Sequence, residues 1–297
     1  MTEKTPAVNA QGFGVAQELE HVRTPDDVVN PPIVLFKNVT KTYHAGHANA
    51  FTAVKDVNFV VEDLPGKGEF VCILGPSGCG KSTILRLIAG LQPQWPHTSG
   101  TVLVQDKPIS GSGADRGMVF QDYTSFDHRT VLDNITFGLE CAGVPRYIRN
   151  DWGREWIEMV GLNVKKDQYK YPHELSGGMK QRVAIARTLI LNPKIILMDE
   201  PFGALDPYTR LSMQDLLVSL WRQVEATIFF ITHSVEEAVY LGDRLYVMSN
   251  SPGTILHELE VAPPDRPASE MQREPEFQEA VNHVHDLILA EEEKKRV

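Results

Sequence analysis

The sequence predicts an α/β fold with a mostly parallel central sheet. Three short, unbroken apolar runs indicate its inner strands, at 70–74, 195–198 and 228–231. Strands that are buried on both faces of a parallel sheet have this composition, because neither face meets water. Polar residues follow each run directly, and open α/β sheets bind ligands beyond the carboxyl ends of their strands. We therefore expect the segments after these runs to meet at one site.

A second, antiparallel sheet is predicted from three stretches with a different pattern. The stretches 33–43, 51–61 and 100–104 alternate in part between apolar and polar residues, and they are rich in β-branched and aromatic side chains. This period of two is typical of strands with one face on a core and the other in water. We assign the three stretches to an antiparallel β subdomain.

A mostly helical insert is predicted at about 122–175. Its clearest helix spans 146–160, where apolar residues recur four positions apart, and Gly161 stands where a C-terminal cap is expected. The predicted apolar face of this helix consists of Trp152, Trp156 and Val160.

The main domain is expected to span 32–261, between two extensions. Residues 1–31 lack an apolar period and lead into the pair Pro31-Pro32, which predicts a flexible N-terminal arm. Residues 262–297 are predicted to form a helix followed by a charged tail, and we expect the helix to dock on its own domain rather than to regulate it. The apolar face of that helix is predicted to be Phe277, Val281, Val284 and Ile288.

Composition excludes some classes of protein. Hydrophobic residues make up 42% of the 297, enough for a sizeable core, and no stretch nears the roughly 18 apolar residues that span a bilayer. The N-terminus lacks the apolar core of a signal peptide, so we expect a cytoplasmic chain that meets a membrane only through a partner. Three irregularly spaced cysteines do not suit a disulfide framework or a zinc site. The formal charge of −10 argues against nucleic acid as a partner.

The stretch 75–83 has the pattern of a phosphate-binding loop. Gly75 and Gly80 frame four residues, Lys81 and Ser82 follow, and the loop lies between a buried strand and a predicted helix at 83–91. Glycines let successive backbone N–H groups point inward, and the helix adds its positive end. Lys81 would supply a charge to the β- and γ-phosphates, and Ser82 would be a ligand of Mg²⁺. Cys79 within this loop is either a reactive, acidified thiol or a small residue that fills the loop.

Two carboxylates follow the run 195–198. Asp199 is the expected Mg²⁺ partner, and Glu200 is then free to act as the general base that polarises an attacking water. The alternative is that the pair only places negative charge at a helix N-terminus.

The motifs stand in the order of a known family. The stretch 173–182 reads His-Glu-Leu-Ser-Gly-Gly-Met-Lys-Gln-Arg, and 203–206 reads Gly-Ala-Leu-Asp. With the phosphate loop, these motifs closely resemble those of a nucleotide-binding subunit of the ATP-binding cassette (ABC) family, over roughly residues 33–260. The resemblance implies a P-loop NTPase (RecA-like) core, an antiparallel β subdomain and a helical insert, the ABC ATPase type.

The resemblance implies roles for single residues. Tyr43 matches the aromatic that stacks on adenine, Gln121 matches the glutamine that touches the metal and the attacking water, and His233 matches the histidine that contacts the γ-phosphate. Asp206 matches a loop that crosses between subunits. Residues implied to be catalytic are Glu200, His233, Gln121 and Lys81, and those implied to hold Mg²⁺ are Ser82, Gln121 and Asp199. Residues implied to bind ATP are Tyr43, Gly75, Pro76, Ser77, Gly78, Cys79, Gly80, Lys81, Ser82, Thr83, Ser176, Gly177, Gly178 and Asp206.

The resemblance also implies partners. In the family the signature loop, here Ser176, Gly177 and Gly178, contacts the nucleotide held by an opposing subunit in a head-to-tail dimer. Only one cassette is present and no internal repeat occurs, so the partner cassette is expected on another chain, most simply an identical one. Integral membrane permease subunits and, indirectly, an extracytoplasmic solute-binding protein are the further expected partners, at the cytoplasmic face of the plasma membrane.

Smaller motifs narrow the subgroup. The stretches 113–117, 131–135, 198–206 and 236–239 look like those of importers for nitrate, sulfonates, taurine and related small anionic solutes. The chain departs from that group at 126–129, where Phe-Asp-His-Arg replaces a segment in which a Pro-Trp pair is common. An exporter or lipid-transport subunit is the alternative within transport. A non-transport ABC ATPase and a phosphotransferase kinase are less favoured, because the chain has one cassette, no sustained heptads and a signature loop.

Overall fold

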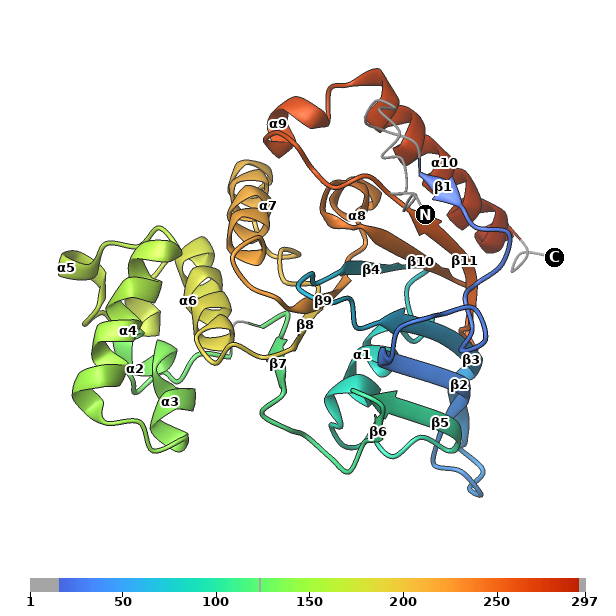
Figure 1. Ribbon diagram of the computed structural model, residues 1–297, viewed down its shortest axis with the longest axis horizontal. Coiled ribbons are helices and arrows are strands. Elements are labelled where there is room, and N and C mark those ends of the chain that lie inside the picture. The colour runs from blue at the N-terminus through green and yellow to red at the C-terminus, as the bar shows by residue number, and fades with distance from the viewer. Residues whose placement is uncertain (1–15, 123, 294–297) are drawn as a thin grey trace, which may run out of the picture.

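A computed structural model describes residues 16–293 except residue 123. Within these residues, two sheets and three groups of helices form the architecture (Figure 1). The larger sheet has the strand order β1 (Gln17–Glu18), β11 (Ile255–Glu260), β10 (Arg244–Met248), β4 (Phe70–Leu74), β9 (Thr227–Ile231), β8 (Ile195–Asp199) and β7 (Arg116–Val119). Strands β10 to β7 run parallel, and β11 and β1 add to the edge in the antiparallel sense.

The three predicted inner strands are confirmed as β4, β8 and β9. Every residue in each of these strands is buried. Side chains of alternate residues point to opposite faces of a sheet, so the strands contribute to two separate hydrophobic cores. Phe70, Ile196 and Phe230 face one core, and their neighbours Val71, Leu197 and Phe229 face the other. A mostly parallel sheet covered on both faces is the α/β fold that the sequence predicts.

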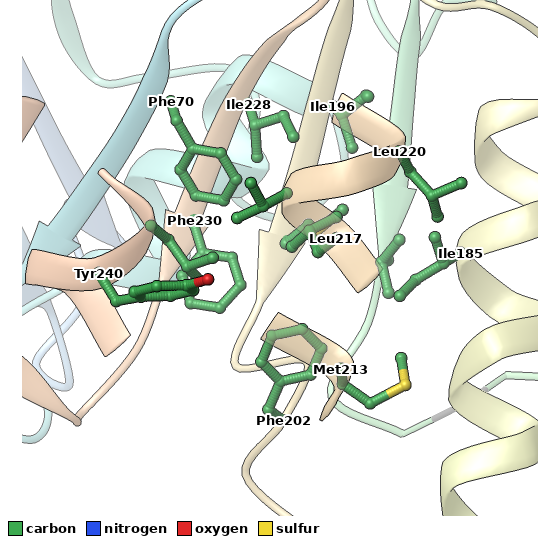
Figure 2. Close-up of a cluster of buried hydrophobic side chains, with 14 of the residues drawn as sticks. Phe70, Ile185, Ile196, Phe202, Met213, Leu217, Leu220, Ile228, Phe230 and Tyr240 are labelled. Carbon is green, nitrogen blue, oxygen red and sulfur yellow. The ribbon is translucent and has the colours of Figure 1, made fainter. Parts of the chain in front are cut away.

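Helices α7 (Pro207–Trp221), α8 (Val235–Leu241), α9 (Ala268–Met271) and α10 (Pro275–Glu293) cover the first face (Figure 1). Aromatic rings of the sheet pack there against aliphatic residues of α7. Phe70 and Phe230 lie 5.7 Å apart between ring centroids, and Phe202 lies 5.6 Å from Phe230. Figure 2 shows Met213, Leu217 and Leu220 of α7 in this cluster.

The second face is covered by α1 (Lys81–Ala89) and by the antiparallel sheet. The order of that sheet is β3 (Phe51–Glu62), β2 (Pro32–Tyr43), β5 (Ser99–Val104) and β6 (Lys107–Pro108). Phe36 of β2 stacks on Phe59 of β3 with ring centroids 4.6 Å apart. The predicted antiparallel subdomain is confirmed, with the short strand β6 added.

The remaining helices form a cluster beyond β7 (Figure 1). They are α2 (Val131–Ile135), α3 (Phe137–Cys141), α4 (Arg146–Met159), α5 (Val164–Asp167), the 3₁₀ turn Pro172–Glu174 and α6 (Gly177–Leu189). Helix α6 packs against both α2 and β7, so it connects this cluster to the sheet. This helical cluster therefore contains α6 in addition to the helices within the predicted range 122–175.

The predicted apolar face of α4 is wrong in its first member. Trp152 is 45% exposed, and the buried residues of α4 are Gly153 and Ile157. A Cβ atom on Gly153 would lie 2.5 Å from Thr136 Cγ2 and 2.6 Å from a Leu132 methyl group. The helices approach closely at Gly153, so the face of α4 that meets them runs through Gly153 and Ile157, and Trp152 lies outside it.

The N-terminal segment does not behave as a free arm where the structure describes it. Residues 16–31 run along the sheet, β1 pairs with β11, and Arg23 Nε lies 2.7 Å from Glu258 Oε1. Glu258 also forms an ion pair with the buried Arg244. Sequence periodicity misses this attachment because many of its contacts are backbone and ionic, and its apolar contacts, at Ala16 and Val22, follow no regular period. The first fifteen residues of the predicted arm and the end of the charged tail, 294–297, lie outside the described residues.

The C-terminal extension docks on the main domain. Phe277, Val281 and Val284 of α10 are buried, and α10 packs on α8 and β10. This is the arrangement that the apolar period of the helix predicts. Among the described residues, no helix is both long and apolar enough to cross a bilayer.

Candidate functional site

The loop between β4 and α1 forms a cradle at the carboxyl end of the sheet. Gly80 precedes α1 in a left-handed conformation, with φ 102°, and no side chain caps the helix. A Cβ atom on Gly80 would lie 2.4 Å from Val54 Cγ1 and 3.0 Å from the Ala53 carbonyl oxygen. Only glycine therefore fits this position. The first N–H groups of α1 remain available to an anion, where the helix dipole favours negative charge.

Lys81 lies folded back on this loop. Its ammonium Nζ donates hydrogen bonds to the carbonyl oxygens of Gly75 at 2.8 Å and Pro76 at 2.9 Å. The side chain is buried, so its charge is held at the loop by carbonyl groups rather than by a carboxylate. A phosphate in the cradle would offer this ammonium stronger, charged acceptors.

Cys79 fills the loop and is not activated. Burial raises the pKa of its thiol above the ordinary value, and the nearby Lys81 ammonium, 3.9 Å from Sγ, only opposes this effect. The hypothesis of an acidified, reactive Cys79 is therefore wrong, and the alternative of a small packing residue fits.

Two oxygen groups meet beside the loop. Ser82 Oγ donates a hydrogen bond to Asp199 Oδ1 at 2.8 Å, so the start of α1 touches the end of β8. The other carboxylate oxygen, Oδ2, lies 3.5 Å from Arg86 Nη2. Hard oxygen ligands of this kind, a hydroxyl and a carboxylate, suit Mg²⁺. Sequence reasoning missed Arg86, although its spacing of four from Ser82 places both on one face of the helix.

Glu200 is held at the centre of the site. Its backbone has φ 47°, which is uncommon for a residue with a side chain, and its N–H donates to the Ile231 carbonyl oxygen at 3.0 Å. The carboxylate Oε1 lies 2.6 Å from His233 Nε2, and Oε2 accepts a bond from Gln121 Nε2 at 3.4 Å. The structure thus brings together three residues from the ends of β7, β8 and β9. Strained conformations of this kind cluster at active sites.

An aromatic pair borders the cradle on the other side. Tyr43 pairs with Phe51 across β2 and β3, and the Tyr43 hydroxyl lies 3.2 Å from Thr83 Oγ1. Phe51 is 53% exposed and lines the same hollow as Tyr43 and the phosphate loop, so its ring is open to a ligand there. Sequence reasoning missed Phe51, and the signal was its place opposite Tyr43 at the ends of the predicted hairpin.

These groups enclose a hollow of about 280 Å³. It is lined by Tyr43, Phe51, Ala53, Ser77, Gly78, Gly80, Lys81, Ser82, Thr83, Glu200 and His233. A larger hollow of about 610 Å³ lies near the opposite ends of the strands, and none of the predicted site residues lines it.

The predicted signature loop belongs to a different surface. Ser176, Gly177 and Gly178 do not line the hollow at Lys81. Ser176 caps α6, and its Oγ accepts a hydrogen bond from the Met179 N–H at 3.4 Å.

Asp206 and the signature loop both lie at the start of α7. A Cβ atom on Gly178 would lie 2.9 Å from Thr209 Cγ2, which places the glycine against the start of α7. Asp206 caps that helix by accepting a hydrogen bond from the Thr209 N–H at 3.1 Å. Hydrogen bonds from the Thr209 side chain and backbone hold the pKa of the Asp206 carboxyl below its usual range. Gly178 and Asp206 therefore flank the same residue, apart from the hollow at the phosphate loop.

Comparisons with known proteins agree with the motifs. The family model described as "ABC transporter" matches residues 54–203. The chain is 45% identical over 253 residues to the nitrate import ATP-binding protein of Synechocystis sp., covering 83% of this chain and 92% of the relative. It is 46% identical over 218 residues to the taurine import ATP-binding protein of Rhizobium johnstonii, covering 71% and 80%. The solved dimeric structure of a bacterial ABC transporter cassette has a TM-score of 0.65 and 33% identity, covering 77% of this chain and 99% of that one.

Proposed function

The chain belongs to the ABC transporter family, and we propose that it is the ATP-hydrolysing subunit of an importer for small anionic solutes such as nitrate or taurine. The observation that carries the hydrolytic part is the Glu200 carboxylate, which lies beside the phosphate cradle between His233 and Gln121. The names of its relatives support the importer part, since two of them are import ATP-binding proteins at 45% and 46% identity.

The phosphate loop binds the nucleotide in this proposal. Backbone N–H groups of 75–83 and the Lys81 ammonium hold the phosphates, and Tyr43 stacks on the adenine ring. Ser82 and Asp199, already in contact at 2.8 Å, hold Mg²⁺. When bound, Mg²⁺ neutralises charge on the phosphate oxygens.

Glu200 acts as the general base. It accepts a proton from a water molecule whose oxygen forms a bond to the γ-phosphorus, while the bond from that phosphorus to the β–γ bridging oxygen breaks. The products are ADP and phosphate. His233 holds the Glu200 carboxylate through its Nε2 contact and reaches the γ-phosphate, and Gln121 orients the water.

The active unit is a head-to-tail pair of cassettes. Ser176, Gly177 and Gly178 of one subunit cap the γ-phosphate that Lys81 holds in the other, which accounts for their separation within one chain. We further propose that the pair binds permease subunits at the cytoplasmic face of the plasma membrane and acts with an extracytoplasmic solute-binding protein. A solved cassette of the family is dimeric, which supports the pair.

Glu200→Gln tests the hydrolytic mechanism. The amide keeps the size of the side chain but cannot accept the proton, so ATP hydrolysis should fall by about 10²–10⁴-fold while the Kd for ATP stays the same. Glu225→Gln is the matched control. Glu225 is exposed and precedes the first residue of β9, at the end of the strand away from His233, so this variant should keep full turnover. Near-normal hydrolysis by Glu200→Gln in steady-state phosphate release would refute the assignment.

A further inference from the structure

A buried carboxylate, Glu237, supports the turn that carries His233. Glu237 lies in the first turn of α8 and is 5% exposed. Its Oε2 accepts a hydrogen bond from the Thr232 hydroxyl, and this hydroxyl in turn accepts a bond from the Ser234 N–H at 3.0 Å. Both neighbours of His233 are therefore fixed by one chain of hydrogen bonds that ends on Glu237.

The other oxygen of this carboxylate reaches a different element. Glu237 Oε1 accepts a hydrogen bond from Gln214 Nε2 at 3.3 Å and lies 3.5 Å from Arg210 Nε, both on α7. Arg210 also donates to the carbonyl oxygen of Leu205 at 3.2 Å, directly before Asp206. Glu237 thus joins the His233 turn to the start of α7.

We propose that Glu237 is a positioning residue for His233, which holds the imidazole at Glu200 by anchoring its turn to α7. The inference rests on the proposed function, because it gives His233 a part in hydrolysis. A buried carboxylate is costly unless its oxygens are paired, and here each oxygen is bonded to a different element. The turn cannot shift without breaking one of these bonds, so the position of His233 is tied to that of α7.

Glu237→Gln separates this role from simple packing. The amide keeps the volume and leaves one oxygen for Thr232, but its NH₂ group cannot accept from Gln214 and carries no charge for Arg210. Misplaced catalytic groups lose up to about a hundredfold in rate, so we expect kcat for ATP hydrolysis to fall about 10–100-fold with KM within about threefold. Glu225→Gln, the exposed control used above, carries no contact with the His233 turn and should change kcat less than about twofold.

A double-mutant cycle with His233→Ala gives the decisive measurement. If Glu237 acts through His233, adding Glu237→Gln to His233→Ala should lower kcat by less than about threefold further. The same 10–100-fold loss in both backgrounds, or an unchanged kcat in Glu237→Gln alone, would overturn the inference. Circular dichroism melts in the absence of nucleotide show whether each variant is folded.

The experiment also distinguishes this inference from the proposed function. Loss of hydrolysis in Glu200→Gln with full turnover in Glu237→Gln would overturn only the positioning role. Full turnover in Glu200→Gln would overturn the proposed function, and this inference with it.

Discussion

The phosphate loop and the signature loop both place glycines at the start of a helix, but the residues around the two loops differ. The glycines stand before α1 in one case and within α6 in the other. Around Gly80 the groups of several elements converge, so that Lys81, Ser82 and Glu200 line one hollow. Ser176 does not line this hollow, and its hydroxyl accepts a hydrogen bond from the Met179 N–H of its own helix.

The difference is what we expect if one chain carries two half-sites, which the proposed pair of cassettes brings together. A helix start with free N–H groups and nearby cations is prepared for an anion. At the other helix start, the hydroxyl of Ser176 caps its own backbone, Thr209 lies against Gly178, and the Lys81 hollow is lined by other residues. In the proposed pair, the ligand of this second helix start is the nucleotide that the other subunit holds.

The largest expected effect comes from mixing two inactive variants. Lys81→Ala should lose nucleotide binding, and Ser176→Arg should keep binding but block closure of the pair, each with a loss of hydrolysis of about a hundredfold or more. A mixed dimer contains one chain of each variant. One of its two sites then combines the intact Lys81 of the Ser176→Arg chain with the intact Ser176 of the Lys81→Ala chain, so that site is restored. A one-to-one mixture should recover at most about a quarter of the normal phosphate release.

The control for this experiment is each variant alone at the same total concentration. A mixture that stays as inactive as its components, while sedimentation shows that mixed dimers form with ATP, would contradict the two half-sites. Full hydrolysis by the unmutated chain with a monomeric sedimentation profile would contradict them as well, because the signature loop would then act within one chain.

The central sheet is predictable from sequence because its strands carry their own signal. A run such as 70–74, apolar at every position, can only be buried on both sides. Strand β10 escapes this reasoning because it begins with Arg244, a charged residue that is buried through ion pairs with Glu69 and Glu258. Glu69 lies 175 residues away in the chain. Such pairing depends on the complete fold and leaves no local pattern.

Some residues of the candidate site can be predicted from local sequence, and others depend on the complete fold. Lys81, Ser82 and Asp199 follow from motif spacing, since the loop and the strand end each have a local pattern. The roles of Arg86 and Glu237 do not, because each depends on a distant residue that the fold brings beside it, Asp199 for Arg86 and Gln214 for Glu237. Trp152 fails for a related reason, since the closeness of α4 to α2 decides which residue is buried.

A smaller effect is expected for the metal-holding part of the phosphate loop. Ser82→Ala removes the hydroxyl that touches Asp199, so the Mg²⁺ concentration for half-maximal hydrolysis should rise about tenfold. Ser82→Thr keeps a hydroxyl and should keep the Mg²⁺ requirement. Titration of MgCl₂ at saturating ATP checks both, and an equal rise in the two variants would contradict a metal role for this hydroxyl.

The smallest effect separates the two tasks of Ser176. As the cap of α6 it should stabilise the nucleotide-free chain, so Ser176→Ala should lower the free energy of unfolding by about 1 kcal/mol and Ser176→Gly by only a few tenths. As part of the opposing site it contributes a hydroxyl that both variants lack, so ATP hydrolysis should fall equally in the two. Urea unfolding and phosphate release, measured on the same samples, give the two quantities. If hydrolysis instead followed the unfolding energies, with Gly near normal and Ala impaired, Ser176 would serve only its own helix, and the contrast with the phosphate loop would rest on Gly177 and Gly178 alone.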